Sequence, residues 1–537
     1  MIRFVVPILL VAATILLGLL LPANPWLVWL SAPVVVLLGV GLWDSVQTKH
    51  SLRRNYPVIA HTRWFFEGLR PYLRSYIVES DLDGSPFNHN DRALVYARAK
   101  GDISSHPFGT ELNVYSEEYD WLSHSMMPNE RAASEFRVDV GGPQCKKPYS
   151  TAILNISAMS FGSLGAKAIE TLNLGAQKGG FYHDTGEGGF SPYHAKHGGD
   201  IVWEIGSGYF GCRTNDGSFD PDKFAKTAVL DQIKMIEIKL SQGAKPGQGG
   251  MLPGAKVTAE IAATRDVPEG KDCISPAAHT AFTTPLELLD FVQQLRTLSG
   301  GNPVGIKLCV GQPHEVFAVM KAMLQTGIKL DFIVVDGGEG GTGAAPVELS
   351  DRVGMPLREG LILVNNALIG SGLRGDIRLA ASGKVISGAS LAMNAALGAD
   401  WSNAARGFMF SLGCVQSLQC HTGNCPTGIA TQSATRQRGL VVEDKAERVY
   451  RFQKQTAAAL RDIVVAMGLE NPSQIRPHHL HERLNAVKSS SIDGIYPFLK
   501  ANVLIDTPEA TPYSRFWAAA QAESFRALPD IRQTSYN

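Results

Sequence analysis

The chain has 537 residues, which is enough for a large hydrophobic core and more than one domain. Its 50 basic residues balance its 50 acidic residues, so the composition gives no sign of the basic face that nucleic-acid binding favours. There are seven cysteines, an odd number, and three of them lie within twelve residues. This pattern argues against a disulfide framework and favours a metal or cluster site.

The N-terminal segment is apolar from Phe4 to Trp43, where no charged residue occurs. Pro22-Ala-Asn-Pro25 divides it into two runs, Phe4–Leu21 and Trp26–Trp43, each close to the about 20 residues that an α-helix needs to span a bilayer. We therefore expect a transmembrane helical hairpin over residues 1–48. A cleaved signal peptide is disfavoured, because a second apolar run takes the place of a cleavage site. A re-entrant hairpin that never crosses is the third interpretation.

Basic residues follow the second run and set the expected orientation. Lys49, His50, Arg53 and Arg54 lie just after it, and positive charge favours the cytoplasmic side. The expected location is therefore the inner (cytoplasmic) membrane, with two transmembrane helices and the catalytic domain in the cytoplasm. A lipid bilayer is thus an expected partner.

The sequence after the apolar segment divides into three regions that differ in their residue patterns. Residues 49–145 mix aromatic residues, Arg and Pro without a sustained period, which indicates a helical connector or cap. Over residues 146–430, β-rich runs alternate with amphipathic stretches such as Pro285–Leu298 and His314–Thr326, as in a parallel sheet. About eight strands predict an α/β fold, a (β/α)8 TIM barrel with helical flanking segments. Residues 431–537 are expected to form a C-terminal helical extension. The expected strands are Ala152–Ser157, Ile201–Ile205, Met235–Leu240, Val304–Val310, Phe332–Asp336, Leu361–Asn365, Ile377–Ala381 and Trp401–Phe410.

The cysteines Cys414, Cys420 and Cys425 form the clearest chemical motif. Thiolates are preferred ligands of iron–sulfur clusters, and three in one loop could hold a cluster with three iron sites. A four-iron cluster or tetrahedral zinc would need a fourth ligand, for which His421 is the nearest candidate. The plain alternative is three buried free cysteines.

Glycine-rich segments follow several expected strands, at the end of the barrel where functional residues lie. The loop Asp336–Pro346 either presents backbone amides to an anion or forms a tight turn. Gly383-Lys384 and Asn403–Arg406 follow the last two strands, the usual phosphate site of such barrels. Lys384 or Arg406 could add a cation there, or remain a solvated charge.

A set of charged residues lies near the same strand ends. Lys239 and Lys307 lie in or at the end of apolar strands, where a lysine is costly unless it meets an anion. A flavin edge, a substrate carboxylate or a structural salt bridge would satisfy it. Glu187, with glycines on both sides, is a candidate proton-transfer group or an exposed loop acid.

Six segments, in this order, resemble the FMN-binding synthase domain of glutamate synthase, and the resemblance covers roughly residues 95–435. It looks like the stand-alone, membrane-tethered form of that family. The segments are Ser157–Gly162, Thr185–Gly189, Ile236–Gly247, Leu252–Val257, Gly340–Pro346 and Cys414–Gln432.

The resemblance implies an oxidoreductase of the CH–NH2 class with FMN and a [3Fe-4S] cluster. Ammonia and 2-oxoglutarate, or a related keto acid, would give 2-iminoglutarate, and the reduced flavin N5 would deliver hydride to make L-glutamate. The cluster would relay electrons to the flavin, and its ligands would be Cys414, Cys420 and Cys425.

The resemblance also assigns roles to single residues. Glu187 and Lys239 would be catalytic, and Lys245, Arg265 and Met251 would surround the keto acid. Residues near FMN would be Ser157, Ala158, Met159, Ser160, Lys307, Gly337, Gly338, Gly341, Thr342, Gly343, Gly383, Lys384, Ala404, Ala405 and Arg406.

Two departures from the family pattern bear on the substrate and the phosphate site. Met251 stands where the larger glutamate synthases carry a glutamine, which removes a hydrogen-bond partner of the keto acid. Ala381-Ser382-Gly383 replaces an Asp-Gly-Gly pattern. No glutaminase domain is expected on this chain, so ammonia would be free or come from a separate amidotransferase.

Other functions and partners stay open. The chain could be an amino-acid or N-alkyl-amino-acid dehydrogenase that passes electrons to a membrane or protein acceptor, or a non-catalytic electron-transfer or scaffold subunit of the membrane. No strand is followed by a Rossmann G-x-G-x-x-G fingerprint with its matching acidic residue, so NAD(P)H is not expected to bind this chain directly, and we expect ferredoxin or a separate reductase subunit as electron donor.

Overall fold

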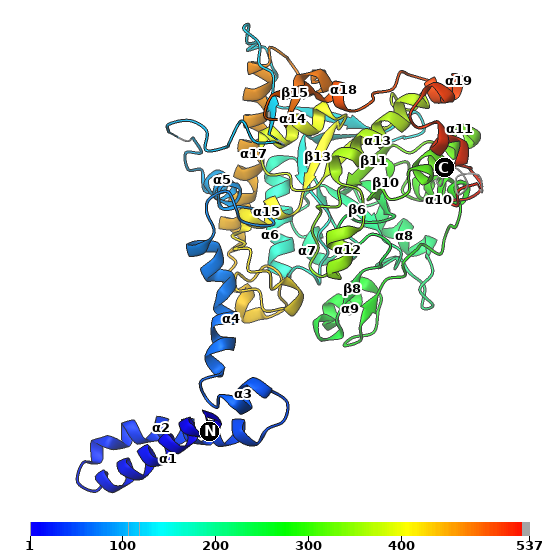
Figure 1. Ribbon diagram of the computed structural model, residues 1–537. Helices are drawn as coiled ribbons and strands as arrows, with labels where there is room; N and C mark the ends of the chain where they lie inside the picture. The colour runs from blue at the N-terminus through cyan, green and yellow to red at the C-terminus, as the bar shows by residue number, and fades with distance from the viewer. Residues whose placement is uncertain (1, 106, 118, 529–537) are drawn as a thin grey trace. The chain divides into compact units, whose positions relative to one another are not determined.

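The computed structural model describes residues 2–105, 107–117 and 119–528 (Figure 1). The chain folds as two compact units, Met1–Asn90 and Asp91–Asn537. The first unit consists of α1 (Ile2–Leu20), the 3-10 turn η1 (Pro25–Leu27), α2 (Val28–Val46), α3 (Ser51–Asn55), α4 (His61–Leu73) and the π-helical turn η2 (Arg74–Val78).

The two predicted apolar runs form helices that pack against each other as α1 and α2 (Figure 1). Among the described residues, one helix, Pro25–Val46 with 22 residues, is long and apolar enough to cross a membrane by length and composition. The other apolar helix, Phe4–Leu20, is shorter than that criterion requires. Two membrane crossings therefore remain a prediction.

The second unit contains the predicted closed barrel of parallel strands. Its order is β10-β11-β12-β13-β4-β5-β6-β7, and β10 closes the ring on β7. The fold class expected from the alternating pattern is confirmed. The strands are β4 (Leu154–Ile156), β5 (His183–Asp184), β6 (Ile201–Ile205), β7 (Ile233–Lys239), β10 (Val304–Leu308), β11 (Phe332–Asp336), β12 (Arg378–Ser382) and β13 (Trp401–Ala404).

Helices surround the barrel, and local sequence explains where they begin. In α10, Thr284 caps the helix by accepting from Glu287 N, Glu287 bonds back, and Pro285 fills the first turn. The helices of the barrel are α6 (Ala166–Gly179), α7 (Pro192–Ala195), α8 (Pro221–Ala228), α10 (Pro285–Leu298), α11 (Pro313–Thr326), α12 (Val347–Arg352), α13 (Leu357–Gly370), α14 (Gly388–Ala396) and α15 (Arg406–Leu412).

Segments outside the barrel ring complete the unit. A long connection between β7 and β10 contains β8 (Met251–Leu252), η3 (Gly254–Lys256), α9 (Ala259–Arg265) and β9 (Cys273–Ile274). The strands β14 (Leu480–Asn485) and β15 (Lys488–Ser491) form an unpredicted hairpin that pairs with β1 (Asp120–Leu122). The remaining elements are α5 (His89–Lys100), β2 (Arg137–Val140), β3 (Tyr149–Ala152), η4 (Cys420–Thr422), α16 (Ala434–Gln437), α17 (Val442–Ala466), η5 (Pro472–Gln474), η6 (Pro477–His479), α18 (Ile492–Ile495), α19 (Val503–Asp506), η7 (Pro508–Ala510) and α20 (Ser514–Ala519).

One expected strand is wrong. Leu361–Asn365 lies inside α13, a helix of 14 residues that begins after Pro356. All five of its residues are buried. A short, fully buried apolar run has no period that separates strand from helix, and here the length of the element decides for helix. Likewise, the run Trp401–Phe410 is a strand only to Ala404 and then becomes α15.

Candidate active site

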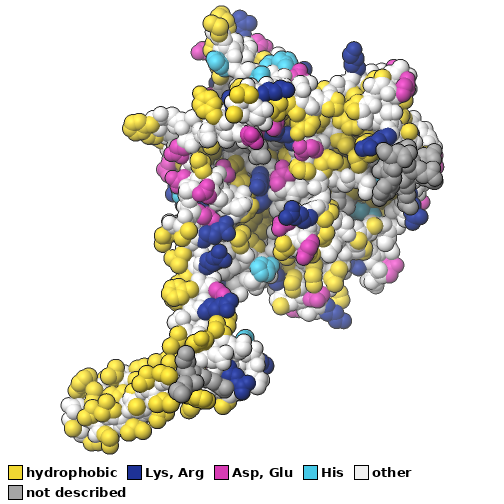
Figure 2. Space-filling view, viewed as in Figure 1, with side chains coloured by type: hydrophobic (Ala, Val, Ile, Leu, Met, Phe, Trp, Pro, Cys, Tyr) yellow, Lys and Arg dark blue, Asp and Glu magenta, His cyan; other side chains and the backbone are white. Residues whose placement is uncertain are grey.

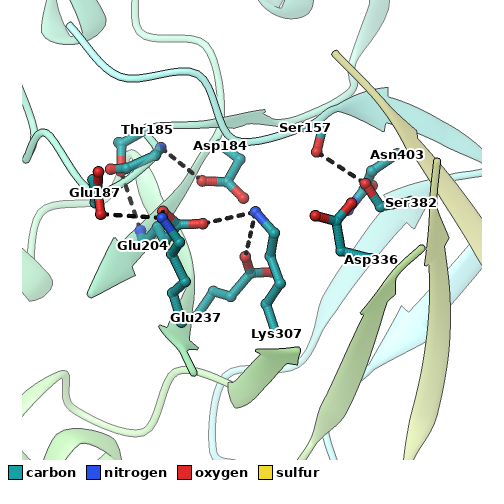
Figure 3. Close-up of polar contacts among 12 residues, drawn as sticks. Ser157, Asp184, Thr185, Glu187, Glu204, Glu237, Lys307, Asp336, Ser382 and Asn403 are labelled. Carbon is teal, nitrogen blue, oxygen red and sulfur yellow. Dashed lines mark hydrogen bonds and ion pairs between the residues drawn. The ribbon is translucent and has the colours of Figure 1, made fainter. Parts of the chain in front are cut away.

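Charged side chains occupy part of the barrel interior, which branched apolar residues usually fill. Asp184, Glu204, Glu237 and Lys307, here called the barrel cluster, come from β5, β6, β7 and β10 and point toward one another (Figure 3). None is more than 5% exposed. The register explains their position, because Glu204 is the neighbour of Glu237 and Lys239 is the neighbour of Lys307. Carboxylates therefore share one level of the barrel and ammonium groups the next.

Ion pairs connect the barrel cluster to the C-terminal end of the barrel. Lys307 Nζ lies 2.8 Å from Glu204 Oε2 and 3.8 Å from Glu237 Oε1. Lys239 Nζ lies 3.0 Å from Glu187 Oε2 and 3.9 Å from Glu204 Oε1. Lys307 thus meets its anions inside the protein, and its place beside a flavin stays a prediction.

Burial and mutual repulsion hold a proton in the barrel cluster. Burial, with the charge of Glu204, raises the pKa of Asp184 to about 7. Burial also raises the pKa of Glu237 well above its usual range, and Asp184 adds to the effect. Burial opposes the charge of Lys307, but Glu204, Glu237 and Asp184 outweigh it and raise the pKa of Lys307 well above its usual value. The direction of these shifts favours the neutral form of Glu237 and the charged form of Lys307.

Glu187 lies in the loop after β5, at the C-terminal end of the barrel (Figure 3). Gly186 has a φ of +62°, and a Cβ there would lie 2.8 Å from Ser160 N, so only glycine lets this loop pack on the segment after β4. Burial would raise the pKa of Glu187, but Lys239, Arg265 and Lys245 outweigh it and lower that pKa. Glu187 is therefore an ionised carboxylate, not the exposed loop acid of the alternative interpretation.

Two of the surrounding cations lack an ion-pair partner. Arg265, on α9, is 3% exposed and donates to Phe161 O at 2.9 Å, while its Nε has no hydrogen-bond partner. Lys245 is 7% exposed, and burial lowers its pKa. Among the described residues, no carboxylate lies within 4.0 Å of either cation. A buried cation without an anion is costly, so this arrangement favours an anionic ligand.

The segment that carries Met251 approaches Glu187 closely. A Cβ added at Gly250 would lie 1.7 Å from Glu187 Oε1, so glycine is required for this approach. Met251 follows on β8 and is 58% exposed. A thioether is at best a weak acceptor, so Met251 offers an apolar surface where an amide would offer hydrogen bonds.

Several residues that the resemblance placed beside FMN lie together at the C-terminal ends of β4, β11, β12 and β13. Ser157 Oγ lies 3.3 Å from Ser382 Oγ, which joins the ends of β4 and β12 (Figure 3). Gly337 N donates to Ser382 O at 2.9 Å, and Gly338 N donates to Met355 O at 2.8 Å. For these two glycines the tight-turn interpretation holds, because their amides are already used. The other expected residues lie in the same connections: Ala158, Met159 and Ser160 after β4, and Ala404 and Ala405 at the end of β13.

Free backbone amides lie nearby and fit a phosphate. The amides of Gly341, Thr342, Gly343, Gly383 and Lys384 donate to no acceptor among the described residues. A Cβ at Gly341 would lie 2.9 Å from Nε of Arg406, whose guanidinium donates to Glu339 O at 2.8 Å. A cluster of free amides beside a guanidinium suits a phosphate dianion.

The three motif cysteines lie close enough to interact. Burial raises the pKa of Cys414 to about 12, and Cys420 and Cys425 add to that rise. Burial opposes ionisation of Cys425, but its hydrogen bonds with the Thr427 hydroxyl, 3.3 Å away, and with the Ala430 amide lower its pKa. A thiolate that accepts amide hydrogen bonds fits an iron–sulfur ligand.

The geometry does not support the zinc alternative. Among the described residues, the only group of three or more whose His, Cys, Asp or Glu ligand atoms all lie within 4.8 Å of one another is Asp184, Glu204 and Glu237. Sulfurs sharing one tetrahedral zinc would lie about 3.8 Å apart, from bonds of about 2.3 Å. His421, the candidate fourth ligand, is exposed.

The acids of the barrel cluster were not predicted from sequence. A usable signal exists, because Glu204 and Glu237 each stand among apolar residues in a strand, in Val-Trp-Glu-Ile and Met-Ile-Glu-Ile. An acid on the inward face of a barrel strand is as costly as a buried lysine, so it too predicts a partner of opposite charge or a hydrogen-bond partner.

Comparisons with known proteins agree with these features. A family model described as a conserved region in glutamate synthase matches residues 132–470. A "glutamate synthase large subunit-like protein YerD" of Bacillus subtilis is 36% identical over 507 residues, covering 87% of this chain and 96% of that protein. An archaeal glutamate synthase (NADPH) of Archaeoglobus fulgidus is 33% identical over 321 residues, 60% of each protein. A mandelate oxidase mutant bound to benzaldehyde has a TM-score of 0.42 at 15% identity, covering 78% of this chain and 95% of that one.

Proposed function

We propose that the chain reductively aminates 2-oxoglutarate or a closely related 2-keto dicarboxylate. The chain belongs to the glutamate synthase family and is an oxidoreductase of that type. FMN would supply the hydride and a [3Fe-4S] cluster would deliver the electrons.

The charge balance around Glu187 carries this proposal. Lys239, Lys245 and Arg265 all act on the Glu187 carboxylate, and Lys307 balances the charge of Glu204, so three positive charges face the one negative charge of Glu187. The excess of two positive charges matches the two carboxylates of a keto dicarboxylate. A keto acid with one carboxylate would leave a cation desolvated without a partner, which is costly.

Each residue then has a specific task. Arg265 and Lys245 would bind the substrate carboxylates. Lys239 would hold the keto oxygen or the imine nitrogen, because its ammonium lies between Glu187 and Glu204. Glu187, an ionised carboxylate, would accept a proton from the attacking ammonia at Oε2, the atom that bonds Lys239 at 3.0 Å, and return it to the keto oxygen as that oxygen leaves as water.

The cofactor sites follow the geometry above. The free amides of Gly341–Gly343, Gly383 and Lys384, with Arg406, would hold the FMN phosphate. Cys414, Cys420 and Cys425 would hold the cluster. Lys256 supports the cysteine loop by donating to Cys420 O at 2.9 Å, and Tyr96 donates to Cys414 O at 2.5 Å.

The N-terminal unit would anchor the enzyme in a membrane. The support is the apolar helix Pro25–Val46 and the adjoining apolar helix Phe4–Leu20. Basic residues after α2 favour a cytoplasmic active site. The electron donor would be ferredoxin or a separate reductase subunit, and nitrogen would come from free ammonia or a separate amidotransferase.

Anaerobic flavin spectroscopy of the full chain in detergent tests this function. Photoreduced enzyme should be reoxidised by 2-oxoglutarate with ammonia, and glutamate should form. Keto acids with one carboxylate, such as pyruvate, should react poorly. Glu187→Gln should keep FMN bound and lose turnover, which would exclude a non-catalytic scaffold. Purified protein without flavin absorbance, or no reoxidation by any dicarboxylic keto acid, would refute the proposal.

Met251 favours a second candidate on the same site. Its exposed thioether follows Gly250, the residue that approaches Glu187, and an apolar side chain in this segment would suit a carbon substituent on the substrate nitrogen or chain. The enzyme would then be an amino-acid or N-alkyl-amino-acid dehydrogenase that passes electrons to a membrane or protein acceptor. Reduction of oxidised flavin by an N-alkyl amino acid, without reoxidation by 2-oxoglutarate and ammonia, would select this candidate.

A further inference from the structure

The segment 61–78, which comprises α4 and η2, has one exposed apolar side. Phe65 and Phe66 are 62% and 59% exposed, and Tyr76 and Ile77 are 60% and 74% exposed. At helical spacing these four residues fall on one side of the segment. A helix in a soluble protein normally buries such a side, so an apolar partner is expected to cover it.

A row of basic residues runs along the segment next to this apolar side. Arg63, Arg70 and Arg74 follow at intervals of seven and four residues, which places them in one row along the helix. Glu67 lies in that row and pairs with Arg63 at 2.8 Å, and Arg74 pairs with Glu79 just after the segment. Residues 49–79 contain six Lys or Arg and two acids, so positive charge remains in excess. Figure 2 shows this mixture of hydrophobic and basic side chains along α4, beside the almost wholly hydrophobic α1 and α2.

Contacts fix the start of α4 to the end of the apolar helix α2. Asp44, 1% exposed, lies in the last turn of α2. Its Oδ2 atom accepts from Val58 N at 2.9 Å and lies 2.9 Å from Nε2 of His61, the first residue of α4. The amphipathic segment therefore begins at the level where the apolar stretch of α2 ends, which is the level of the headgroups if α2 crosses a bilayer.

We propose that residues 61–78 lie on the surface of an anionic phospholipid bilayer, with Phe65, Phe66, Tyr76 and Ile77 among the acyl chains and Arg63, Arg70 and Arg74 at the lipid phosphates. The occupant is an anionic membrane because the apolar side is continuous with a helix suited to span one and the polar side carries excess positive charge. This inference rests on the membrane anchoring proposed above and is independent of the reaction that the barrel catalyses.

Photo-crosslinking of the full chain in lipid nanodiscs tests the proposal. Benzoylphenylalanine replaces Phe66 in one variant and Glu67 in another, so that positions about 100° apart around the helix report on the apolar side and on the arginine row. The discs contain phosphatidylcholine with or without phosphatidylglycerol. We expect lipid adducts at position 66, few at position 67, and more adducts when phosphatidylglycerol is present. Replacing Arg63, Arg70 and Arg74 together by Gln should remove the phosphatidylglycerol dependence, with a loss of about fivefold per arginine in the preference for anionic lipid.

Three results would overturn the proposal. The first is adducts at position 66 to protein, either a second copy or another part of the same chain. The second is equal lipid labelling at positions 66 and 67. The third is labelling that ignores phosphatidylglycerol. Benzoylphenylalanine at Val36 of α2, a residue 65% exposed, separates this failure from a failure of anchoring. Lipid adducts at 36 without adducts at 66 refute only the interfacial helix, whereas none at either position refutes the anchoring as well.

Discussion

Replacing Lys307 by Met should destabilise the protein strongly and in a pH-dependent way. Lys307 Nζ lies 2.8 Å from Glu204 Oε2, so the variant removes the nearest cation of this buried carboxylate. At an effective dielectric constant of about 20, that separation corresponds to an attraction of about 6 kcal/mol, which the cost of desolvating the ions largely offsets. Breaking such a pair from one side costs about 3–5 kcal/mol.

In the variant, the buried carboxylate can lose its uncompensated charge by binding a proton, and this protonation sets the pH dependence of the stability. For an ordinary glutamate with a pKa of about 4.3, this costs about 4 kcal/mol at pH 7 and about 2 kcal/mol at pH 5.5. The penalty relative to wild type should therefore shrink by about 1.4 kcal/mol for each unit by which the pH falls. The sign follows because the folded variant takes up a proton that the unfolded chain does not hold.

Urea unfolding of FMN-free protein in detergent, followed by tryptophan fluorescence between pH 5.5 and 8, measures this effect. Flavin must be removed, because a bound ligand adds its own stabilisation. Lys329→Met is the matched control, since Lys329 pairs with Asp376 at 2.6 Å but both side chains are about one-third exposed. It should cost about 0–1 kcal/mol with little pH dependence. A penalty for Lys307→Met that does not change with pH would refute the reasoning.

Three further predictions concern other features. Burial lowers the pKa of His183 to about 3, so only the unfolded chain binds a proton at this residue as the pH falls below about 6.5. At pH 5 this difference destabilises the folded state by about 2 kcal/mol. His183→Leu should remove that part of the acid sensitivity in urea titrations. Gly243→Ala should abolish FMN binding in a flavin-retention assay, because its Cβ would lie 1.7 Å from Gly337 O, whereas Gly375→Ala, with nothing within 4 Å, should bind FMN normally. Cys420→Ala should lower iron content while FMN is retained, whereas Cys145→Ala should change neither; equal iron in both variants would contradict the assigned ligands.

Local sequence predicted those elements whose signals are local. The bounds of β6, β11 and α10 agree with the expectation at both ends, because apolar β-rich runs define the strands and the Thr284–Glu287 capping box defines the helix. The strand β5 was missed because it has two residues, His183 and Asp184, and no run of apolar residues marks it. Only its place between β4 and β6 in the barrel makes it a strand.

The site was predicted in part for a similar reason. Glu187, Lys239 and Lys245 stand in distinctive local motifs, Arg265 was expected from the family resemblance alone, and the structure brings all four together. The barrel cluster could not be read in the same way, since its members are separated along the chain and meet only through the register of neighbouring strands. Pairing of Glu204 with Glu237 is a property of the closed barrel, which no single segment encodes.

Lys239 interacts both with Glu187 and with Glu204 of the barrel cluster, and this link between the two sets of charges bears on substrate choice. Lys239 lies between Glu187 and Glu204, so its position and charge depend on a carboxylate that the substrate need not touch. Burial opposes the charge of Lys239, but Glu187 and Glu204 outweigh it and raise its pKa, which keeps the ammonium charged when a dianion enters. Met251 contributes no strong hydrogen bond. For the proposed reaction, selection among keto acids would then rest on matching charges more than on hydrogen bonds, and such a site would separate dicarboxylates from monocarboxylates better than it separates one dicarboxylate from another.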